Sequence, residues 1–271
     1  MIRNCPDACE GFAIKAGQTQ KDQMLKQIDI VNAYSEIGVG TGDTLVVQSS
    51  YKGTGGVEGG VPGLIEALKA VVGNSGTLIM PAYNFTSWTE KHYFDSRETP
   101  SGIGTVTEAF RLSAGVGRSR HPIHSLCIYG RLRDELCAMD YVDSFGPDSV
   151  FTRLLDMNIM YSTLGTGTEM PFLPCHYPET LLQVPYRRQK LFSGVYVDAA
   201  GQPSVRTYGF HVRRAPDQPS PVYPAHVMQF ERGVVKEHVH QGMKMMFAHA
   251  REYHDSMVDL IGERPAMFAS C

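Results

Sequence analysis

The sequence of 271 residues lacks several features that would assign it to a protein class at once. It contains no run of 18 apolar residues, which argues against a transmembrane helix. Lys and Arg number 25 against 28 Asp and Glu, so there is no basic excess to match a nucleic-acid backbone. The first residues include no apolar stretch of the kind that directs secretion. We therefore expect a cytoplasmic protein that binds neither nucleic acid nor membrane.

Cysteine and histidine also lack the spacing of a metal site. The six cysteines lie at positions 5, 9, 127, 137, 175 and 271, without a C-x-x-C pair, which favours reduced thiols over a disulfide framework or zinc. The histidines near the C-terminus match no H-E-x-x-H type of ligand set. These are His238, His240, His249 and His254. We expect them on the faces of a solvated helix, with no metal bound.

What the sequence does contain is a pattern of alternating strands and helices. Apolar runs at 44–50 and 77–83 indicate buried strands, and a helical pattern after Pro62 lies between them. Such a unit predicts a βαβ crossover. Further strands are predicted at 126–130 and 159–167, and further helices at 21–37, 105–113, 131–140 and 150–158. The prediction is an α/β fold with three layers, α/β/α, around a mostly parallel mixed sheet.

The second part of the chain has a different texture. From Pro171 prolines crowd the sequence and helical periodicity fades, so we expect irregular or antiparallel segments packed onto the first part. A long amphipathic pattern returns at 236–261 and predicts a helix. With 42% hydrophobic residues, the chain has enough apolar material for one sizeable core.

Two loops are candidate anion sites. The glycine-rich stretch 53–60 follows a strand and precedes a helix, so its backbone amides can hold phosphate. It matches neither common phosphate-loop motif, and a tight turn is an equally good interpretation. The second loop contains Arg118, Ser119, Arg120 and His121, where two guanidiniums flank a hydroxyl. A solvated basic loop is the alternative.

The segment around His176 carries the candidate for acid–base chemistry. Pro178 favours a helix start, and the three-residue spacing of His176 and Glu179 places both on one helix face. The carboxylate would orient the imidazole, while the positive helix end would lower its pKa. We expect a histidine that is neutral at pH 7 and accepts a proton. A structural His–Glu contact stays open, and Cys175 as a nucleophile is a more remote alternative.

Four blocks in order resemble the aminoglycoside 3-N-acetyltransferase family of acetyl-CoA-dependent enzymes. They are GDTLVVQSSYKGTGGVEGG; VVGNSGTLIMPAY with FDSRETPSGIGTVTEAFR; GVGRSRHPIHSLCIYG; and GTG with CHYPE and YR. The resemblance implies a single acyltransferase domain over residues 1–271, with a CoA-binding α/β portion at 21–170 and an acceptor-side portion at 171–271. It also implies acetyl-CoA as co-substrate and direct transfer to a small-molecule amine, without a metal.

The resemblance further implies roles for single residues. His176 would be the general base, oriented by Glu179. Contacts to coenzyme A are implied for Ser49, Ser50, Tyr51, Lys52, Gly53, Thr54, Arg118, Ser119 and His121. Acceptor contacts are expected from Tyr83, Asn84 and Arg213. The chain departs from the family at Gln48, where histidine is frequent; glutamine can hydrogen-bond there but cannot titrate.

Charge leads to a prediction about the acceptor. A site for polycationic aminoglycosides should be rich in carboxylates, but residues 171–240 hold eight Lys and Arg against five Asp and Glu. We therefore expect a neutral or anionic acceptor: an amino sugar, a sugar nucleotide or an amino-acid-like biosynthetic intermediate. An aminoglycoside, a different acyl-CoA, a non-catalytic CoA-binding role and a homodimer stay open.

Overall fold

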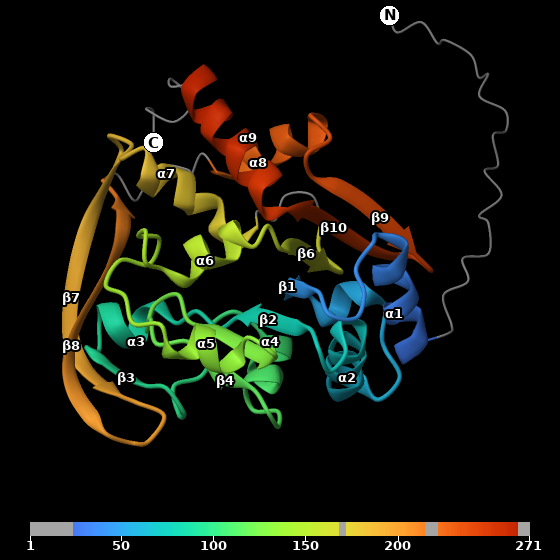
Figure 1. Ribbon diagram of the computed structural model, residues 1–271, viewed down its shortest axis with the longest axis horizontal. Helices are drawn as coiled ribbons and strands as arrows, with labels where there is room; N and C mark the ends of the chain where they lie inside the picture. The colour runs from blue at the N-terminus through green and yellow to red at the C-terminus, as the bar shows by residue number, and fades with distance from the viewer. Residues whose placement is uncertain (1–23, 168–171, 215–221, 265–271) are drawn as a thin grey trace, which may run out of the picture.

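The apolar runs of the sequence form the middle of a sheet in the computed structural model (Figure 1). The structure describes residues 24–167, 172–214 and 222–264, and within them this sheet has seven strands. In spatial order they are β4 (Gly117–Arg118), β5 (Leu126–Gly130), β2 (Thr77–Pro81), β1 (Thr44–Ser49), β6 (Met160–Leu164), β10 (Met243–His249) and β9 (Lys236–His240). Leu45 and Val47 of β1 join one core cluster and Val46 the other. The central strand is therefore buried on both faces.

Strand direction divides this sheet into a parallel centre and antiparallel flanks. β1 pairs in parallel with β2 and with β6, and α2 (Gly60–Val72) connects β1 to β2 as the predicted crossover. β5 and β4 on one side, and β10 and β9 on the other, pair antiparallel. The predicted α/β class with a mixed sheet is confirmed. The parallel part is smaller than predicted, because it comprises the three central strands alone.

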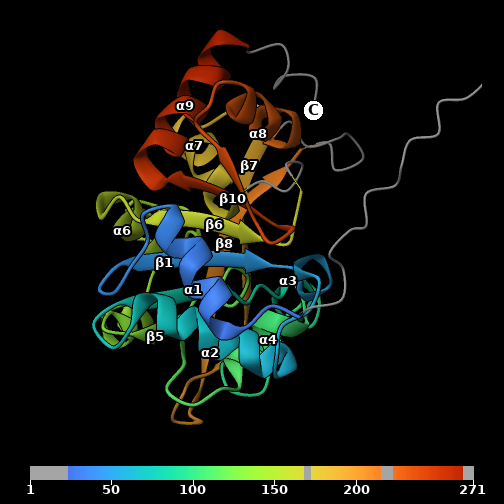
Figure 2. The same ribbon diagram turned by 90° about the vertical axis from the view of Figure 1, so that its right-hand side faces the viewer.

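Helices cover both faces of the sheet, which gives the three predicted layers (Figure 2). One face is covered by α1 (Gln27–Glu36), α2 and α4 (Thr105–Arg111). The other is covered by α5 (Arg133–Ala138), α6 (Val150–Asp156), α7 (Tyr177–Leu181), α8 (Val222–Glu231) and α9 (Ala250–Glu263). Within the described ranges, no helix combines the length and the apolar character needed to span a bilayer.

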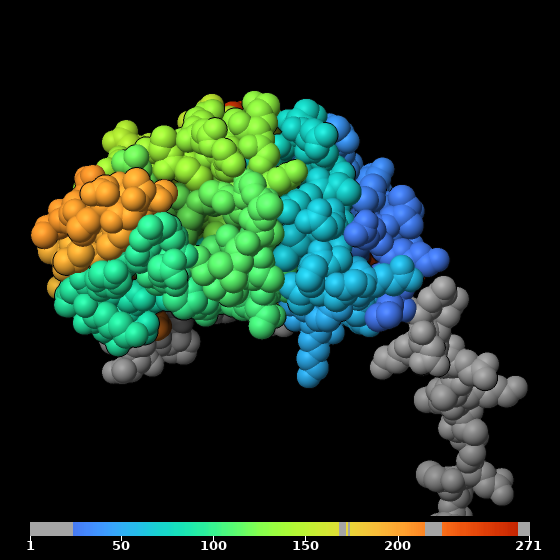
Figure 3. Space-filling model, turned by 90° about the horizontal axis from the view of Figure 1, so that it is seen from below, coloured from blue at the N-terminus to red at the C-terminus, as the bar shows by residue number. Residues whose placement is uncertain are grey.

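A second sheet lies beside the central one and contains a long hairpin. β7 (Arg187–Val197) pairs antiparallel with β8 (Pro203–Arg213), and β3 (Tyr93–Asp95) pairs in parallel with β7. The hairpin packs against the segment that carries α3 (Phe85–Thr89) and β3, as the view from below shows (Figure 3). The antiparallel pairing predicted after residue 171 is confirmed. The segment 84–104, between the predicted strand at 77–83 and the predicted helix at 105–113, contains α3 and β3.

The helix predicted at 236–261 is wrong over its first half. That stretch forms the strands β9 and β10, and α9 begins at Ala250. Gln241 and Gly242 between the strands both have positive φ, which suits a two-residue hairpin turn. On β10, Met245 and Met246 enter opposite core clusters, which is the alternation of a strand. The cluster of methionines and histidines had matched a helical period by coincidence.

The glycine-rich loop is built around a contact between two backbones. A Cβ atom on Gly53 would lie 1.7 Å from the carbonyl oxygen of Gly165, in the turn after β6. Gly53 belongs to the short 3₁₀ helix η1 (Tyr51–Thr54) that follows β1. The contact therefore ties together the ends of two parallel strands.

This contact predicts a stability difference between two glycines. Gly53→Ala should lower the free energy of unfolding by about 1–3 kcal/mol, because the new methyl group overlaps backbone atoms. Gly40→Ala is the matched control: a Cβ there meets nothing within 4 Å, and the expected change is at most about 1 kcal/mol, towards higher stability. Urea unfolding measures both. Equal effects would contradict the packing role of Gly53.

Candidate active site

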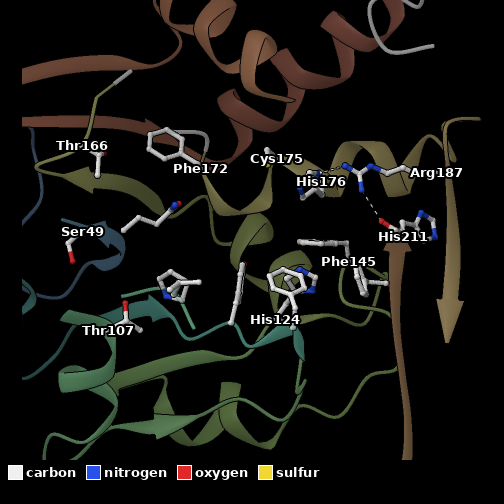
Figure 4. Close-up of a pocket in the computed structure, with 16 residues that line it drawn as sticks. Ser49, Thr107, His124, Phe145, Thr166, Phe172, Cys175, His176, Arg187 and His211 are labelled. Atoms are coloured by element: carbon white, nitrogen blue, oxygen red, sulfur yellow. Dashed lines mark hydrogen bonds between the residues drawn. The ribbon is translucent and has the colours of Figure 1, made fainter. Parts of the chain in front are cut away.

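A pocket of about 470 Å³ lies at the carboxyl ends of the parallel strands (Figure 4). Open α/β sheets bind ligands at this edge, and the volume suits a small molecule. Residues at or just beyond the ends of β1, β2 and β6 form one side of it: Gln48, Ser49, Pro81, Tyr83 and Thr166. Aromatic side chains form much of the rest: Phe85, Phe145, Phe172 and Phe210. The remaining lining residues are Ile103, Thr107, His124, Cys175, His176, Arg187 and His211.

His176 stands in the wall of this pocket and is held by Glu179. The imidazole Nδ1 lies 2.6 Å from Oε2 of Glu179, three residues further along the chain. The predicted contact between the two side chains is confirmed, and His176 is the N-cap residue that directly precedes α7. With Nδ1 donating to the carboxylate, Nε2 carries the lone pair. The side chain of His176 is 31% exposed, so the ring can reach a bound molecule.

Glu179 is fully buried and has two further partners. The Tyr186 hydroxyl donates to Oε1 at 2.8 Å, and Nε of Arg187 lies 2.7 Å from Oε2. Arg187 also donates from Nη1 to the carbonyl of His211, and its Nη2 lies 3.1 Å from Nδ1 of His176. These contacts fix the first residue of β7 against α7.

No role for Arg187 was predicted from its place in the sequence. Tyr186 and Arg187 are the YR of the fourth sequence block, which served only to show the resemblance to the family. Nothing in its spacing indicates that the start of β7 folds back onto α7. His124 and His211 were also missed. His124 is buried beside Ser144, and its pKa lies well below the usual value because burial disfavours the charged ring.

The pKa of His176 differs from the expectation. Burial opposes the imidazolium form, but the adjacent Cys175 sulfur and the Glu179 carboxylate outweigh it and raise the pKa of His176 to about 9. The neutral histidine expected at pH 7 is therefore wrong for the free protein. The helix that should have lowered the pKa has only five residues, and its dipole is correspondingly small. Burial acts to raise the pKa of Glu179, but His176, Arg187 and Tyr186 together hold it below its usual value.

Three hydroxyl groups in this pocket indicate that its ligand has polar atoms. Oγ of Ser49, the hydroxyl of Tyr83 and Oγ1 of Thr166 are buried, and none has a hydrogen-bond partner among the described residues. Burial raises the pKa of Tyr83 well above its usual value, so this hydroxyl keeps its proton. An unsatisfied buried hydroxyl costs about 1–3 kcal/mol, and a bound ligand that pairs with it recovers that cost.

Most residues of the predicted coenzyme loop hold the loop itself together. Ser50 caps η1 by accepting a bond from the Gly53 amide, and Thr54 donates to the Tyr51 carbonyl. The Tyr51 hydroxyl bonds to the backbone of residue 57. Lys52 is exposed. Ser49 alone among residues 49–54 lines the pocket, and coenzyme contacts by the others stay predictions.

The second predicted anion loop is committed to the fold. The Arg118 guanidinium donates to the carbonyls of Ala82 and Thr99 and to Oγ of Ser125, and burial lowers its pKa to about 10. Oγ of Ser119 accepts a bond from the amide of residue 126. His121 is fully buried, which lowers its pKa to about 4. None of the three lines the pocket, so the predicted phosphate contact gains no support.

The predicted acceptor residues separate in the same way. Tyr83 lines the pocket. Asn84 caps α3 by accepting a bond from the Ser87 amide and donating to the Pro100 carbonyl. Arg213 lies at the last position of β8, opposite Arg187, and is not among the lining residues. Cys5, Cys9 and Cys271 lie outside the described residues.

Comparison with known proteins identifies the family. A family model described as aminoglycoside 3-N-acetyltransferase matches residues 46–261, and the chain belongs to this family. Aminoglycoside N(3)-acetyltransferase VII of Streptomyces paromomycinus is 33% identical over 172 residues, 56% of this chain and 59% of that protein. The chain spans about three fifths of the length of curated relatives such as this one.

Solved structures share the fold over nearly the whole chain. Aminoglycoside acetyltransferase AAC(3)-Xa has a TM-score of 0.76 at 25% identity, with coverage of 90% of this chain and 94% of that one. AAC-IIIb, solved as a binary complex with CoASH, also gives 0.76 at 17% identity, covering 89% of this chain and 98% of that one.

The buried ion pair predicts a double-mutant cycle. Glu179→Gln and Arg187→Met should each lower the free energy of unfolding by about 3–5 kcal/mol, because each leaves a buried partner without its counter-charge. The double variant should cost clearly less than the sum of the two, because it removes both charges. Urea unfolding of the four proteins measures the coupling. Additive effects would show that the two groups do not depend on each other.

Proposed function

We propose that this protein is an acetyl-CoA-dependent N-acetyltransferase that acts on an amine of a small molecule. The observation that carries the proposal is the His176–Glu179 pair in the wall of a pocket that also contains three unpartnered hydroxyls. Membership of the acetyltransferase family and the likeness to a fold solved with CoASH support it. Acetyl-CoA supplies an activated thioester, so the protein's own residues need only bind, orient and move protons.

His176 is the proposed general base. An amine is largely protonated near pH 7 and must lose a proton before its nitrogen can attack a carbonyl carbon. Nε2 of the neutral ring accepts that proton, while Nδ1–H stays on the Glu179 carboxylate. The resulting imidazolium is stabilised by the same carboxylate, which is itself held ionised by Arg187 and Tyr186. Glu179 and Arg187 act as positioning residues.

The hydroxyls of Ser49, Tyr83 and Thr166 are the proposed donors to the substrates. Buried hydroxyls that lack a partner among the described residues keep their hydrogen for a ligand, so they can donate to an oxygen that gains negative charge without breaking a bond within those residues. The aromatic walls exclude water from the thioester and fix the two substrates relative to each other. The protein thereby supports direct transfer with both substrates bound: the amine nitrogen bonds to the thioester carbonyl carbon, the carbon–sulfur bond breaks, and the CoA thiolate leaves and takes up the proton held by His176.

The pocket also bears on the acceptor. None of the described residues that line the pocket is Asp or Glu. Arg187 is the one Lys or Arg among these lining residues, and it is paired with Glu179. The positive balance of residues 171–240 is partly neutralised elsewhere, since Arg206 pairs with Asp140 and Arg232 with Glu263. A partly aromatic pocket whose lining holds no carboxylate and in which His176 is protonated at pH 7 disfavours a polycation. We therefore propose a small amine with no further positive charge as the acceptor.

The base assignment predicts the pH dependence of the reaction. Because the pKa of His176 is raised to about 9, kcat/KM should rise with pH, pass its half-point near pH 9 and level off above it. His176→Gln should lower kcat by about 10²–10⁴-fold and abolish that inflection, while CoA binding persists. Thiol release from acetyl-CoA measures the rate, and acceptors of different amine pKa separate the enzyme's ionisation from their own.

Cys175→Ala is the matched control for a covalent mechanism. It lies next to His176 in the same wall, so a cysteine nucleophile would make this variant inactive. We expect this variant to keep activity within about tenfold of wild type. The inflection in kcat/KM should move to lower pH, because one cause of the raised His176 pKa is removed. Wild-type rates in His176→Gln would refute the base assignment.

The acceptor proposal predicts an order of turnover in an amine panel. Uncharged amino sugars, and amines that also carry a carboxylate or phosphate, should be acetylated with kcat/KM at least about tenfold above that of a polycationic aminoglycoside. The same thiol-release assay ranks them at fixed ionic strength. A polycation that outperforms every other amine would reject this acceptor class while leaving acetyl transfer itself intact.

A further inference from the structure

A second cluster of chemistry-bearing side chains contains no residue that lines the pocket. It joins the last residue of α1, Glu36, to His238 and His240 on the edge strand β9 (Figure 1). Oε2 of Glu36 lies 2.7 Å from Nε2 of His238 and 3.0 Å from Nδ1 of His240. The two histidines are two residues apart on one strand, so their side chains share a face.

The three atoms have nearly the separation that a bound metal needs. In a tetrahedral zinc site with bonds of about 2.0–2.1 Å, ligand atoms lie roughly 3.3 Å apart. Here all three candidate atoms lie within 4.8 Å of one another, and the two carboxylate contacts are shorter than 3.3 Å by well under 1 Å. Small rotations of the side chains are therefore enough to admit an ion.

The surroundings of His240 leave its ring available for this purpose. Its side chain is 13% exposed, and its other nitrogen, Nε2, has no hydrogen-bond partner among the described residues. The ring is thus held by the contact to Glu36 and by no competing bond. Glu36 is about half exposed, which leaves a path for an ion and for a water molecule.

We propose that Glu36, His238 and His240 bind one zinc ion, with water as the fourth ligand. A set of two imidazoles and a carboxylate binds Zn²⁺ in preference to Mg²⁺ or Ca²⁺. The ion would link α1 to the edge strand β9 across 202 residues of sequence. Among the described residues β9 pairs with β10 alone, so this link would hold the edge of the sheet in place. The ion takes no part in the proposed acetyl transfer.

Zinc uptake by tag-free full-length protein tests the site. Protein dialysed against a chelator and then titrated with zinc chloride alone should bind about one equivalent, and saturating zinc should raise Tm by about 5 °C. His238→Gln and His240→Gln should each weaken binding by more than about tenfold and remove the rise in Tm. Their circular dichroism and thiol-release rates without zinc should match wild type, which shows that both variants fold.

His254→Gln is the matched control. His254 pairs with Asp255 at 3.0 Å, a single histidine and a single carboxylate, and should not hold zinc tightly. This variant should bind zinc as wild type does. Failure of the wild type to take up zinc, or equal uptake by His238→Gln and His240→Gln, would overturn the proposal. Magnesium chloride in place of zinc should leave Tm unchanged.

Discussion

The carboxylate of Glu179 is the constraint on which the proposed site depends. A charge with no solvent exposure is tolerated only when its partners are in place, and here they come from two places in the chain: His176 directly before α7, and Tyr186 and Arg187 where β7 begins. The same set of contacts therefore orients the imidazole, sets its proton affinity and fixes where the hairpin leaves the core. Helix, hairpin and base form one unit.

The two halves of the pocket have different physical origins. The parallel strands β1, β2 and β6 bring Ser49, Tyr83 and Thr166 together, because their carboxyl ends meet at one edge of a sheet that is buried on both faces. The opposite wall includes Cys175 and His176, which directly precede α7, and side chains of the hairpin. Rigid strand ends thus carry the unpartnered hydroxyls, whereas the wall opposite carries the ionisable group. In the proposed reaction the hydroxyls donate to the oxygen that gains negative charge, and His176 takes the proton from the amine nitrogen.

Local patterns in the sequence predicted what short spacing determines. Apolar runs gave the central strands and the crossover, and a three-residue interval gave the His176–Glu179 pair. The remaining features depend on distant contacts. From its local sequence Arg118 was predicted to bind an anion. In the structure its guanidinium donates to the carbonyl of Ala82, 36 residues away in the chain, and local spacing does not reveal this contact. Arg187 had no local signal for its role, and the raised pKa of His176 depends on the packing around Cys175 and Glu179, which spacing does not reveal.

The register of the hairpin has a consequence for how this chain tolerates change. Arg187 lies opposite Arg213, and Lys190 opposite Phe210, so the pocket residues occupy the end of the hairpin nearest the core. The turn at 198–202 lies at the other end, where added or lost residues would leave that pairing undisturbed. A single residue inserted into β8 before Phe210 would instead shift the pairing by one and carry Phe210 and His211 to the opposite face. Length is thus free to vary at the tip, whereas the base of the hairpin must keep its count.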